Sequence, residues 1–350
     1  MYSLRRINLV RILLLFLLLV FILAIFLVKD NYRLKTELSF EKSFRTFDKN
    51  LKNNFNLNEE TNKKFSNEFN RIGAPFDIVP NIVHYVLFTV HEIQFSHFIS
   101  FLSVLKNQKP DRIYIHCDCT QLFGTFYERV LRVANKTNTQ IIIRTIERPT
   151  EIFGQKLSEK WLNWHSSDIT RIRVLLEFGG IYLDRDVYVV QSLDVFRKYE
   201  MTLNWGLNQL LENSILIAAQ NARFLKLWLG SYHEYDPNQW YWNAGIVPTM
   251  RLLQNFPSIV HRVFWEFGAY GPDVCTLLYS GYFRSWRKAY YTFHLTIRGN
   301  AIPFKDWCFM GRVPKSLPEV FTEENVIKLN VTFGEMTRDL FDFEKQMINK

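Results

Sequence analysis

Two aspartates, Asp184 and Asp186, interrupt the otherwise apolar stretch GGIYLDRDVYVV, which runs from residue 179 to residue 190. The stretch predicts a buried strand, and residues two apart on a strand point to the same face. The two carboxylates should therefore converge, and like charges so close together repel each other unless a cation lies between them. We expect a hard divalent ion that prefers oxygen ligands, Mn²⁺ or Mg²⁺. Two solvated acids at a strand end are the alternative, which a D-x-D pattern alone leaves open.

The segment before that strand, residues 166–178, predicts a helix. Its apolar side chains recur at intervals of three and four residues and should face the sheet. Ser166 or Ser167 can cap the start of this helix, and Gly179 and Gly180 can end it in the left-handed conformation.

The same helix carries Asp168 and Arg171 near its start. Residues three apart share a helix face, so the carboxylate and the guanidinium should lie side by side. Spacing alone leaves two interpretations open: an ordinary surface ion pair, or a part of the site that the two aspartates of the next strand begin.

Strands and helices alternate along the chain from residue 81. The predicted strands cover residues 81–88, 111–118, 139–146 and 180–190, and the predicted helices cover residues 96–106, 123–135 and 166–178. Such alternation is typical of an α/β fold with a mostly parallel sheet and helices on both faces. Ligands on such sheets bind at the carboxyl ends of the strands, which is where Asp184 and Asp186 fall. The sequence has neither G-x-G-x-x-G nor G-x-x-x-x-G-K-[ST], which excludes the usual dinucleotide and P-loop phosphate sites.

The N-terminal part predicts a membrane anchor. Residues 12–28 carry no charge and no turn residue, and a helix of that length spans about 25 Å, enough for a thin bilayer. Because arginines precede this run, residues 1–11 are expected in the cytosol and the remainder of the chain in the lumen. Residues 29–75, polar and rich in Asn and Lys, predict a helical stem, and residues 76–350 predict the lumenal catalytic domain. A cleaved signal peptide is the alternative for the apolar run.

The composition narrows the range of partners. The chain has 350 residues and a formal net charge of +9. No run of Lys and Arg with interleaved aromatic residues accompanies that charge, so we expect no nucleic-acid partner. An anionic substrate or a membrane-facing surface explains the charge as well. The glycosylation sequons at Asn135 and Asn330 are usable only if this part of the chain is lumenal.

The four cysteines, Cys117, Cys119, Cys275 and Cys308, would lie in an oxidising compartment if the chain is lumenal. They allow up to two disulfides in any of three pairings. A bond between Cys117 and Cys119 is not expected, because the two lie two residues apart on a predicted strand.

The positions around the two aspartates resemble a known pattern, which reads S-D, then R three residues on from the Asp, then L, then G-G-x-Y-x-D-x-D. The matching residues are Asp168, Arg171, Leu175, Gly179, Gly180, Tyr182, Asp184 and Asp186. The pattern is similar to the sugar-binding region of the D-x-D glycosyltransferases of sequence family thirty-two. That family includes α-1,4-galactosyl- and α-1,4-N-acetylglucosaminyltransferases and an initiating mannosyltransferase. The resemblance extends at varying strength over residues 78–300 and is far more specific than the two acids alone.

This resemblance implies a GT-A-like fold and the retaining transfer of a hexosyl unit from a sugar nucleotide, UDP-linked, to a glycan, glycolipid or glycoprotein acceptor. It implies that Asp168 and Arg171 belong to the catalytic centre and bind hydroxyls of the donor sugar. It implies that Asp184 and Asp186 hold the metal, Mn²⁺ or Mg²⁺. The residues implied to contact the donor or its nucleotide are His84, Tyr182, Asp184 and His294. Together with the predicted anchor, it implies a single-pass protein of the Golgi membrane with a lumenal catalytic domain.

The chemistry of glycosyl transfer agrees with these assignments. Breaking a glycosyl–phosphate bond places negative charge on the leaving diphosphate, which a divalent ion held by carboxylates neutralises. A retaining enzyme must also support a cationic sugar, with a nucleophile or by attack of the acceptor on the same face. Glu212 and Asp273 are candidates for the nucleophile because they fall near blocks that resemble the family, and a structural role is the alternative for each.

The chain departs from the family pattern at two aromatic positions. Leu87 or Phe88 stands where the first strand of the family usually has Trp, and Thr296 stands where Trp commonly follows a His-Leu pair near His294. Three consecutive aromatic residues at 240–242 can line an acceptor groove or pack in the core.

Three other functions fit parts of the sequence. A degenerate relative would bind sugar nucleotide or glycan without transfer, but the intact set of acidic and arginine residues argues against it. A membrane-anchored, metal-dependent nuclease or phosphohydrolase would need a second acidic cluster, which is not evident. An anchored interaction protein would leave the D-x-D pattern unexplained.

Overall fold

The computed structural model describes residues 65–269, 271–297, 308, 314 and 317–349. The chain divides into two compact units, Met1–Glu59 and Glu60–Lys350, and the described residues all belong to the second. The predicted cytosolic tail, the transmembrane segment and most of the predicted stem lie outside the described residues. Within the described ranges, no helix has both the length and the apolar character needed to cross a bilayer.

Strands and helices follow one another closely along the chain. The strands are β1 Ile82–Leu87, β2 Arg112–Cys117, β3 Gln140–Thr145, β4 Glu151–Ile152, β5 Gln155–Lys156, β6 Gly180–Leu183, β7 Val187–Val189, β8 Met201–Asn204, β9 Glu212–Ala218, β10 His261–Val263 and β11 Thr292–His294. The α-helices are α3 Asn67–Arg71, α4 Phe95–Ser103, α5 Thr125–Lys136, α6 Leu162–Phe178, α7 Arg223–Ser231, α8 Gly271–Cys275, α9 Trp286–Ala289, α11 Glu323–Val326 and α12 Thr332–Ile348. Short 3₁₀ or π-helical turns are η1 Val104–Gln108, η2 Asp194–Phe196, η3 Tyr232–Glu234, η4 Trp242–Ile246, η5 Pro248–Leu253, η6 Pro257–Ile259 and η7 Thr276–Ser280.

A seven-stranded sheet in the order β10-β8-β9-β6-β1-β2-β3 forms the centre of the second unit. Neighbouring strands pair in parallel from β6 through β1 and β2 to β3, and β10 pairs in parallel with β8. Within this sheet β9 is the strand that pairs antiparallel with both of its neighbours, β6 and β8. The prediction of an α/β fold with a mostly parallel sheet is confirmed. Because β9 runs against the others, its first residues lie at the edge where the other strands end.

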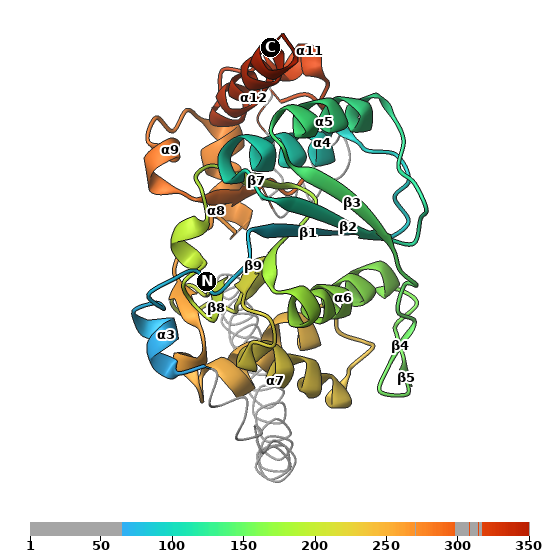
Figure 1. Ribbon diagram of the computed structural model, residues 1–350, viewed down its shortest axis with the longest axis vertical. Helices are drawn as coiled ribbons and strands as arrows, with labels where there is room; N and C mark the ends of the chain where they lie inside the picture. The colour runs from blue at the N-terminus through green and yellow to red at the C-terminus, as the bar shows by residue number, and fades with distance from the viewer. Residues whose placement is uncertain (1–64, 270, 298–307, 309–313, 315–316, 350) are drawn as a thin grey trace, which may run out of the picture. The chain divides into compact units, whose positions relative to one another are not determined.

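Helices cover both faces of the sheet, with α4 and α5 on one face of β1, β2 and β3 and α6 on the other (Figure 1). The side chains of β1 alternate between these faces. Tyr85 points toward α4, where its ring centroid lies 4.5 Å from that of Phe101. His84 points to the opposite face, where its ring centroid lies 5.9 Å from that of Phe178 at the end of α6. Strand β1 is therefore buried on both faces, as expected for a central parallel strand.

The folded part begins before the boundary expected from the sequence. In α3, the Asn70 side chain is buried and donates to Glu200 Oε2 at 3.2 Å. The Ala74 amide donates to the Lys198 carbonyl at 2.8 Å. Residues 65–75, which their polarity assigns to the stem, therefore pack on the sheet domain, because these polar groups pair with partners inside it.

The four cysteines form two disulfides, Cys117–Cys119 and Cys275–Cys308. The expectation that Cys117 and Cys119 would not pair is therefore wrong. Strand β2 ends at Cys117, and the chain bends immediately after it. Cys119 therefore does not lie on the strand, and the strand geometry that argued against a bond does not apply. Their Cα atoms lie 5.2 Å apart, a usual separation for a disulfide.

Candidate active site

The D-x-D segment forms a turn at the carboxyl end of β6. Strand β6 ends at Leu183 and β7 begins at Val187, whose amide donates to the Asp184 carbonyl at 3.0 Å. The prediction of one strand running through both aspartates is therefore wrong, whereas their position at the carboxyl end of a strand agrees with the prediction. Because a turn does not alternate side chains between two faces, the two carboxylates have different partners.

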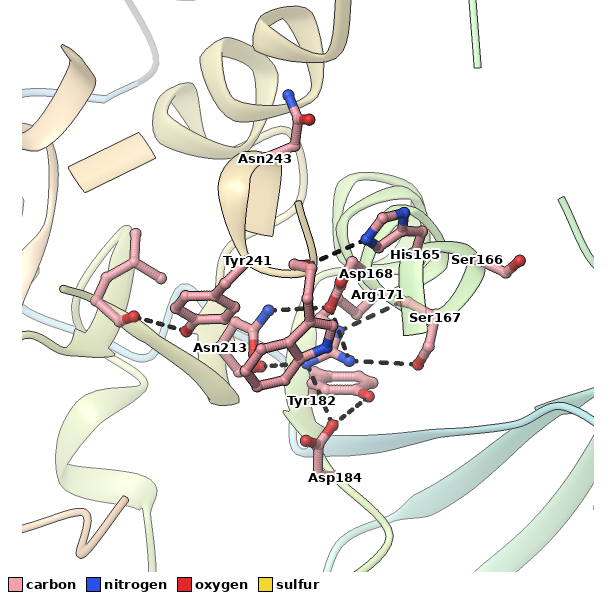
Figure 2. A network of polar contacts seen from close by, with 12 residues as sticks. His165, Ser166, Ser167, Asp168, Arg171, Tyr182, Asp184, Asn213, Tyr241 and Asn243 are labelled. Carbon is pink, nitrogen blue, oxygen red and sulfur yellow. Dashed lines mark hydrogen bonds and ion pairs between the residues drawn. The ribbon is translucent and has the colours of Figure 1, made fainter. Parts of the chain in front are cut away.

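Asp184 belongs to a cluster around the Arg171 guanidinium (Figure 2). Arg171 Nη1 lies 3.2 Å from Asp184 Oδ1, and Arg171 Nη2 lies 3.1 Å from Asp168 Oδ1. Arg171 Nη1 also donates to the Asn213 carbonyl at 2.7 Å, and Nε donates to the Ser167 carbonyl at 3.3 Å. Each guanidinium nitrogen thus has a partner, and one planar group holds two carboxylates at a fixed separation.

Helix α6 and the turn after it position this cluster. The helix begins at Leu162 rather than at the predicted residue 166, and Ser166 is not a cap, since its hydroxyl donates to the Leu162 carbonyl at 2.5 Å. The chain leaves α6 through Gly179 and Gly180, whose φ angles are 64° and 112°. Because Gly179 has a ψ of −171°, it does not adopt the left-handed helical conformation expected at this helix end. A Cβ on Gly180 would lie 2.7 Å from the Ile82 carbonyl oxygen, so only glycine lets β6 approach β1 this closely.

Asn213 fixes the orientation of the Asp168 carboxylate. The second residue of β9, it donates from Nδ2 to Asp168 Oδ1 at 3.0 Å. Burial raises the pKa of Asp168 to about 6, although the nearby Arg171 charge opposes the rise. The described contacts of the carboxylate with Asn213 and Arg171 both involve Oδ1. Oδ2 is therefore the oxygen that can accept a hydrogen bond from a ligand.

Tyr182 supports the cluster from within the protein. Its hydroxyl donates to Asp184 Oδ1 at 2.6 Å, and the Arg171 guanidinium lies 4.6 Å from the centre of its ring. The side chain is 1% exposed. The predicted donor-binding residue Tyr182 is therefore in the cluster, where it holds Asp184 and Arg171 rather than facing a ligand.

Asp186 pairs with strand β11 instead of with Arg171. Its Oδ1 lies 3.2 Å from His294 Nε2, and its Oδ2 accepts the Ile297 amide at 2.9 Å. The antiparallel pairing of β11 with β7 sets His294 opposite Val187 and thereby beside the D-x-D turn. Burial lowers the pKa of His294, but the Asp186 carboxylate outweighs burial and raises it to about 9. His294 is therefore an imidazolium at neutral pH. The structure places it beside Asp186, one of the two aspartates of the D-x-D turn.

Glu212 lies at the start of β9, next to Asn213. Burial raises the pKa of its carboxyl to about 7, with the His294 charge opposing the rise and the Asp184 charge adding to it. Glu212 is therefore close enough to the D-x-D turn to share its electrostatic field. Asp273, by contrast, is exposed on α8. Of the two candidates for a nucleophile, Glu212 is the one that lies with the cluster.

His84 lies apart from the cluster, in the core. It has no exposed surface, and its Nε2 donates to the Gly179 carbonyl at 2.8 Å, since a carbonyl only accepts. Its Nδ1 then accepts a hydrogen bond from His116 Nε2 at 3.0 Å. Burial lowers the pKa of His84 to about 4 and that of His116 to about 3, so both are neutral at pH 7. With both ring nitrogens bonded inside the protein, His84 cannot contact a nucleotide, and the structure corrects that prediction: His84 ties β1 to the turn between α6 and β6.

The D-x-D carboxylates fit a divalent ion that brings other ligands with it. In the part of the chain that the structure describes, no group of three or more His, Cys, Asp or Glu side chains is arranged to hold a metal. Ions such as Mg²⁺ are nevertheless commonly held by one or two carboxylates together with substrate phosphates and water. The Asp184 side chain is 24% exposed, and its described contacts involve Oδ1, so Oδ2 is available. Asp186 is 11% exposed and has partners on both oxygens. Asp184 is therefore the better placed of the two ligands.

A hollow of about 530 Å³ on the C-terminal helices does not belong to this cluster. Among its lining residues, Arg129 is paired with both Glu323 and Glu344 at 2.6 Å. The Arg129 charge is therefore satisfied within the protein, and we assign no site to the hollow.

Sequence reasoning missed Asn213 as a member of the site. The available signal was the polar pair Glu212–Asn213 directly before the apolar run SILIAA, which places two polar side chains at the start of a strand. Their importance depends on the direction of β9, because only an antiparallel strand has its first residues at the edge where β6 ends.

Comparison with known proteins identifies the same segment. Residues 99–206 match the family model described as the glycosyltransferase sugar-binding region containing DXD motif. A curated relative, glucan organizing enzyme 1 of Cryptococcus neoformans var. grubii, is 28% identical over 201 residues, which are 52% of this chain and 52% of the relative. The chain thus matches about half the length of that relative. The match confirms that this segment resembles the sugar-binding region of the D-x-D glycosyltransferases.

Solved structures give a weaker likeness. The glycosyltransferase GlyE of Streptococcus pneumoniae is 11% identical, with 77% of this chain and 64% of GlyE covered and a TM-score of 0.42. The PaToxG glycosyltransferase is 18% identical, with 55% of this chain and 74% of the PaToxG chain covered and a TM-score of 0.37. An active-site mutant of LgtC is 12% identical, with 67% and 98% covered and a TM-score of 0.37. These TM-scores are too low to support an argument, so the assignment depends on the sequence match.

Proposed function

We propose that this chain, whose residues 99–206 match the sugar-binding region of the D-x-D glycosyltransferases, moves a hexosyl unit from a UDP-linked sugar nucleotide to a glycan or glycoconjugate acceptor. We propose further that transfer retains the configuration of the sugar and requires Mn²⁺ or Mg²⁺. One observation carries the proposal: the Arg171 guanidinium contacts both Asp168 and Asp184. It joins the acid assigned to the donor sugar to the acid assigned to the metal and diphosphate. Both ends of a sugar nucleotide would therefore be held in a fixed relation, which lowers the entropic cost of reaching the transition state.

Each residue of the cluster has a distinct part in this reaction. Asp168 Oδ2 would accept a hydrogen bond from a hydroxyl of the donor sugar, while Asn213 and Arg171 contact Oδ1. Glu212, on the same edge of the sheet, would support the positive charge that develops on the sugar. A divalent ion, when bound at Asp184 and Asp186, supplies Lewis-acid stabilisation of the charge on the leaving diphosphate.

The proposal is tested by hydrolysis of the donor without an acceptor. The full chain is incubated with UDP-glucose, UDP-galactose, UDP-N-acetylglucosamine and GDP-mannose in turn, with Mn²⁺ or with a chelator, and the released nucleoside diphosphate is measured. We expect release from at least one donor, which the chelator suppresses. The Asp186→Asn variant should lower that release by about 10³-fold, since metal stabilisation of the leaving group is worth several kcal/mol.

A matched control is Asp111→Asn. Asp111 is an exposed acid directly before β2, at the opposite edge of the sheet from the D-x-D turn, so its substitution should leave hydrolysis unchanged. Full activity in Asp186→Asn, or activity indifferent to the chelator, would contradict the metal role. Tight donor binding without any hydrolysis or transfer would favour the degenerate relative.

We also propose that the chain is a single-pass protein of the Golgi membrane, anchored by residues 12–28 with the catalytic domain in the lumen. Two disulfides and the exposed sequon residues Asn135 and Asn330 support a lumenal location. Endoglycosidase treatment of the chain expressed in a eukaryotic host should increase its electrophoretic mobility, and Asn135→Gln combined with Asn330→Gln should remove the change. An unglycosylated, protease-accessible chain on the cytosolic side would contradict this orientation.

A further inference from the structure

The face of α6 that carries Asp168 continues toward the start of the helix as an aromatic surface. Trp161 is the N-cap residue, and Trp164 and His165 follow at spacings of three and four. Residues at these spacings share one helix face with Asp168. Seven residues separate Trp161 from Asp168, which corresponds to about 10 Å along the helix axis. The aromatic surface therefore begins next to the proposed sugar-binding acid and extends away from it.

A second segment completes this surface. The Trp240 ring centroid lies 6.5 Å from that of Trp161 and 5.3 Å from that of Tyr241, and Trp161 makes an edge contact with Trp164 at 5.7 Å. Trp240 is 47% exposed and Trp164 is 37% exposed. We call Trp161, Trp164 and Trp240 the tryptophan platform. The exposure shows that Trp164 and Trp240 do not pack in the core, so of the aromatic residues at 240–242 the core-packing alternative is excluded for Trp240.

His165 holds the two segments of the platform together. Its Nε2 donates to the Trp240 carbonyl at 3.1 Å, and its Nδ1 accepts from the Tyr235 hydroxyl at 2.6 Å. The Tyr235 oxygen in turn accepts the Ser158 amide at 2.9 Å. Burial lowers the pKa of His165, which agrees with a neutral ring that donates from one nitrogen and accepts at the other. A buried chain of hydrogen bonds thus fixes the position of the backbone at the exposed residue Trp240.

Tyr241 connects the platform to the catalytic cluster, and Figure 2 shows it beside Asn213. Its hydroxyl donates to the Leu211 carbonyl at 2.8 Å. A Cβ on Gly245 would lie 2.0 Å from the Tyr241 ring, so the absence of a side chain at Gly245 is what allows the ring to lie there. Tyr241 therefore links the residue just before β9, the strand that carries Asn213, to the Trp240 ring.

The chemistry of the platform favours a sugar ring as its occupant. A pyranose has an apolar face of C–H groups, which packs against an aromatic ring, and a polar rim of hydroxyls. Exposed polar residues precede two of the rings in sequence, Asn163 before Trp164 and Gln239 before Trp240. The Lys160 ammonium lies 4.6 Å from the Trp161 ring centre and so occupies part of that ring. Trp240 is consequently the ring best placed to receive a ligand.

We propose that the tryptophan platform is the acceptor subsite, on which a hexopyranose ring of a glycan stacks against Trp240 while its attacking hydroxyl faces the Asp168–Arg171 cluster. The description of the bound glycan as an acceptor rests on the proposed glycosyl transfer. Glycan binding by the platform can nevertheless be measured without any transfer. His165 is a positioning residue, because it reaches the ligand only through Trp240.

Binding of the full chain to an array of immobilised oligosaccharides, covering the common hexoses and linkages, tests the platform directly. We expect wild-type protein to bind at least one group of glycans, and Trp240→Ala to bind the same glycans about tenfold more weakly, the upper range for loss of an aromatic contact. Trp240→Phe should keep most of the binding, because a ring remains. The matched control is Trp265→Ala, since Trp265 is 55% exposed but follows β10 and has its described ring contact with Tyr290 rather than with a platform residue.

Donor hydrolysis separates this inference from the proposed function. Trp240→Ala should leave donor hydrolysis unchanged and raise the KM for a bound glycan without lowering kcat, and His165→Ala should do the same more weakly. Array binding unaffected by Trp240→Ala, or no glycan binding by wild-type protein, overturns the platform even if the donor is hydrolysed. Platform-dependent glycan binding without donor hydrolysis overturns the proposed function instead. A loss of donor binding in Trp240→Ala would show that the ring stacks on the nucleobase and would also overturn the inference.

Discussion

The molecule contains two clusters in which an arginine meets a buried carboxylate, at opposite edges of the same sheet. Arg171 meets Asp168 and Asp184 where β6 ends, and Arg223 meets Glu200 directly before β8 begins. We call them the Arg171 cluster and the Arg223 cluster. Their chemical composition is nearly the same, since each also includes an asparagine that donates to the carboxylate.

The two clusters differ in how completely the carboxylates are used. In the Arg223 cluster both Glu200 oxygens accept hydrogen bonds: Arg223 donates to both, and Asn70 donates to Oε2. The side chains of Glu200 and Arg223 are 0% and 7% exposed. In the Arg171 cluster one cation serves two acids, the described contacts fall on one oxygen of each, and Asp184 is 24% exposed. A saturated pair stabilises the fold, whereas an unsaturated pair leaves oxygens for a ligand.

The largest effect on stability should come from breaking the saturated pair. Arg223→Met keeps much of the apolar stem but leaves the buried Glu200 carboxylate without its cation. We expect the free energy of unfolding to fall by about 3–5 kcal/mol. Urea denaturation followed by tryptophan fluorescence measures it. Because an unfolded variant would be uninformative, Arg223→Lys serves as a milder second variant, which should lose less. Stability equal to wild type in both variants would show that the Arg223 cluster does not hold the fold.

The same substitution in the other cluster should act on activity. Arg171→Met is expected to lower kcat/KM for the donor by about 10²–10³-fold, the usual effect of losing one preorganised polar group at a reacting centre. Its cost in stability should be smaller than that of Arg223→Met, because water reaches Asp184 and can solvate the freed charge. Parallel donor hydrolysis and urea denaturation of the two variants decide the comparison, and identical profiles would erase the distinction between the clusters.

The two asparagines sharpen the contrast at a smaller scale. Asn213→Ala removes the hydrogen bond to Asp168 and should lower donor hydrolysis by about tenfold or more, as expected for a bond to a charged group. Asn70→Ala removes the corresponding bond to Glu200 and should instead lower the free energy of unfolding by about 1–3 kcal/mol, with hydrolysis unchanged. If both variants lost activity, or both lost only stability, the assignment of one cluster to function would be wrong.

The smallest expected effect is a difference in the pH dependence of stability. Burial raises the pKa of Asp168 from 3.8 to about 6, so the folded state holds this proton more tightly than the unfolded state. Stability contributed by this group therefore rises as the pH falls through 6 toward 4 and is absent above pH 6. Asp168→Asn does not titrate, so the wild-type protein should gain stability relative to this variant on acidification from pH 7 to pH 4. Urea midpoints at several pH values measure the difference, and parallel curves would show an ordinary pKa for Asp168.

Local pattern was enough to predict much of the fold and the centre of the site. The periods of strands and helices gave β1, β2, β3, α4 and α5 close to their observed bounds. The positions of Asp168, Arg171 and Asp184 follow from helix spacing and from the rule that sites lie at the carboxyl ends of strands. These relations involve residues near one another in sequence, so the chain itself sets their geometry.

The predictions that were wrong or missed concern strand ends and contacts between segments that are distant in sequence. The resemblance implies that His84 contacts the donor or its nucleotide, but the packing of α6 on the sheet buries it against His116. The D-x-D turn and the Cys117–Cys119 pair both follow from the point at which a strand stops, which apolar patterning does not mark. Asn213 depends on the antiparallel course of β9, which no local pattern encodes.

The packing of α3 has a practical consequence for anyone shortening the chain. A form that starts at residue 76, as polarity alone would suggest, discards Asn70 and Ala74 and with them their bonds to Glu200 and Lys198. Such a truncation would also remove the Asn70 side-chain oxygen that accepts a hydrogen bond from the amide of the buried residue Met201. Crystallisation trials and enzyme preparations that keep the residues from 65 onward would retain these hydrogen bonds.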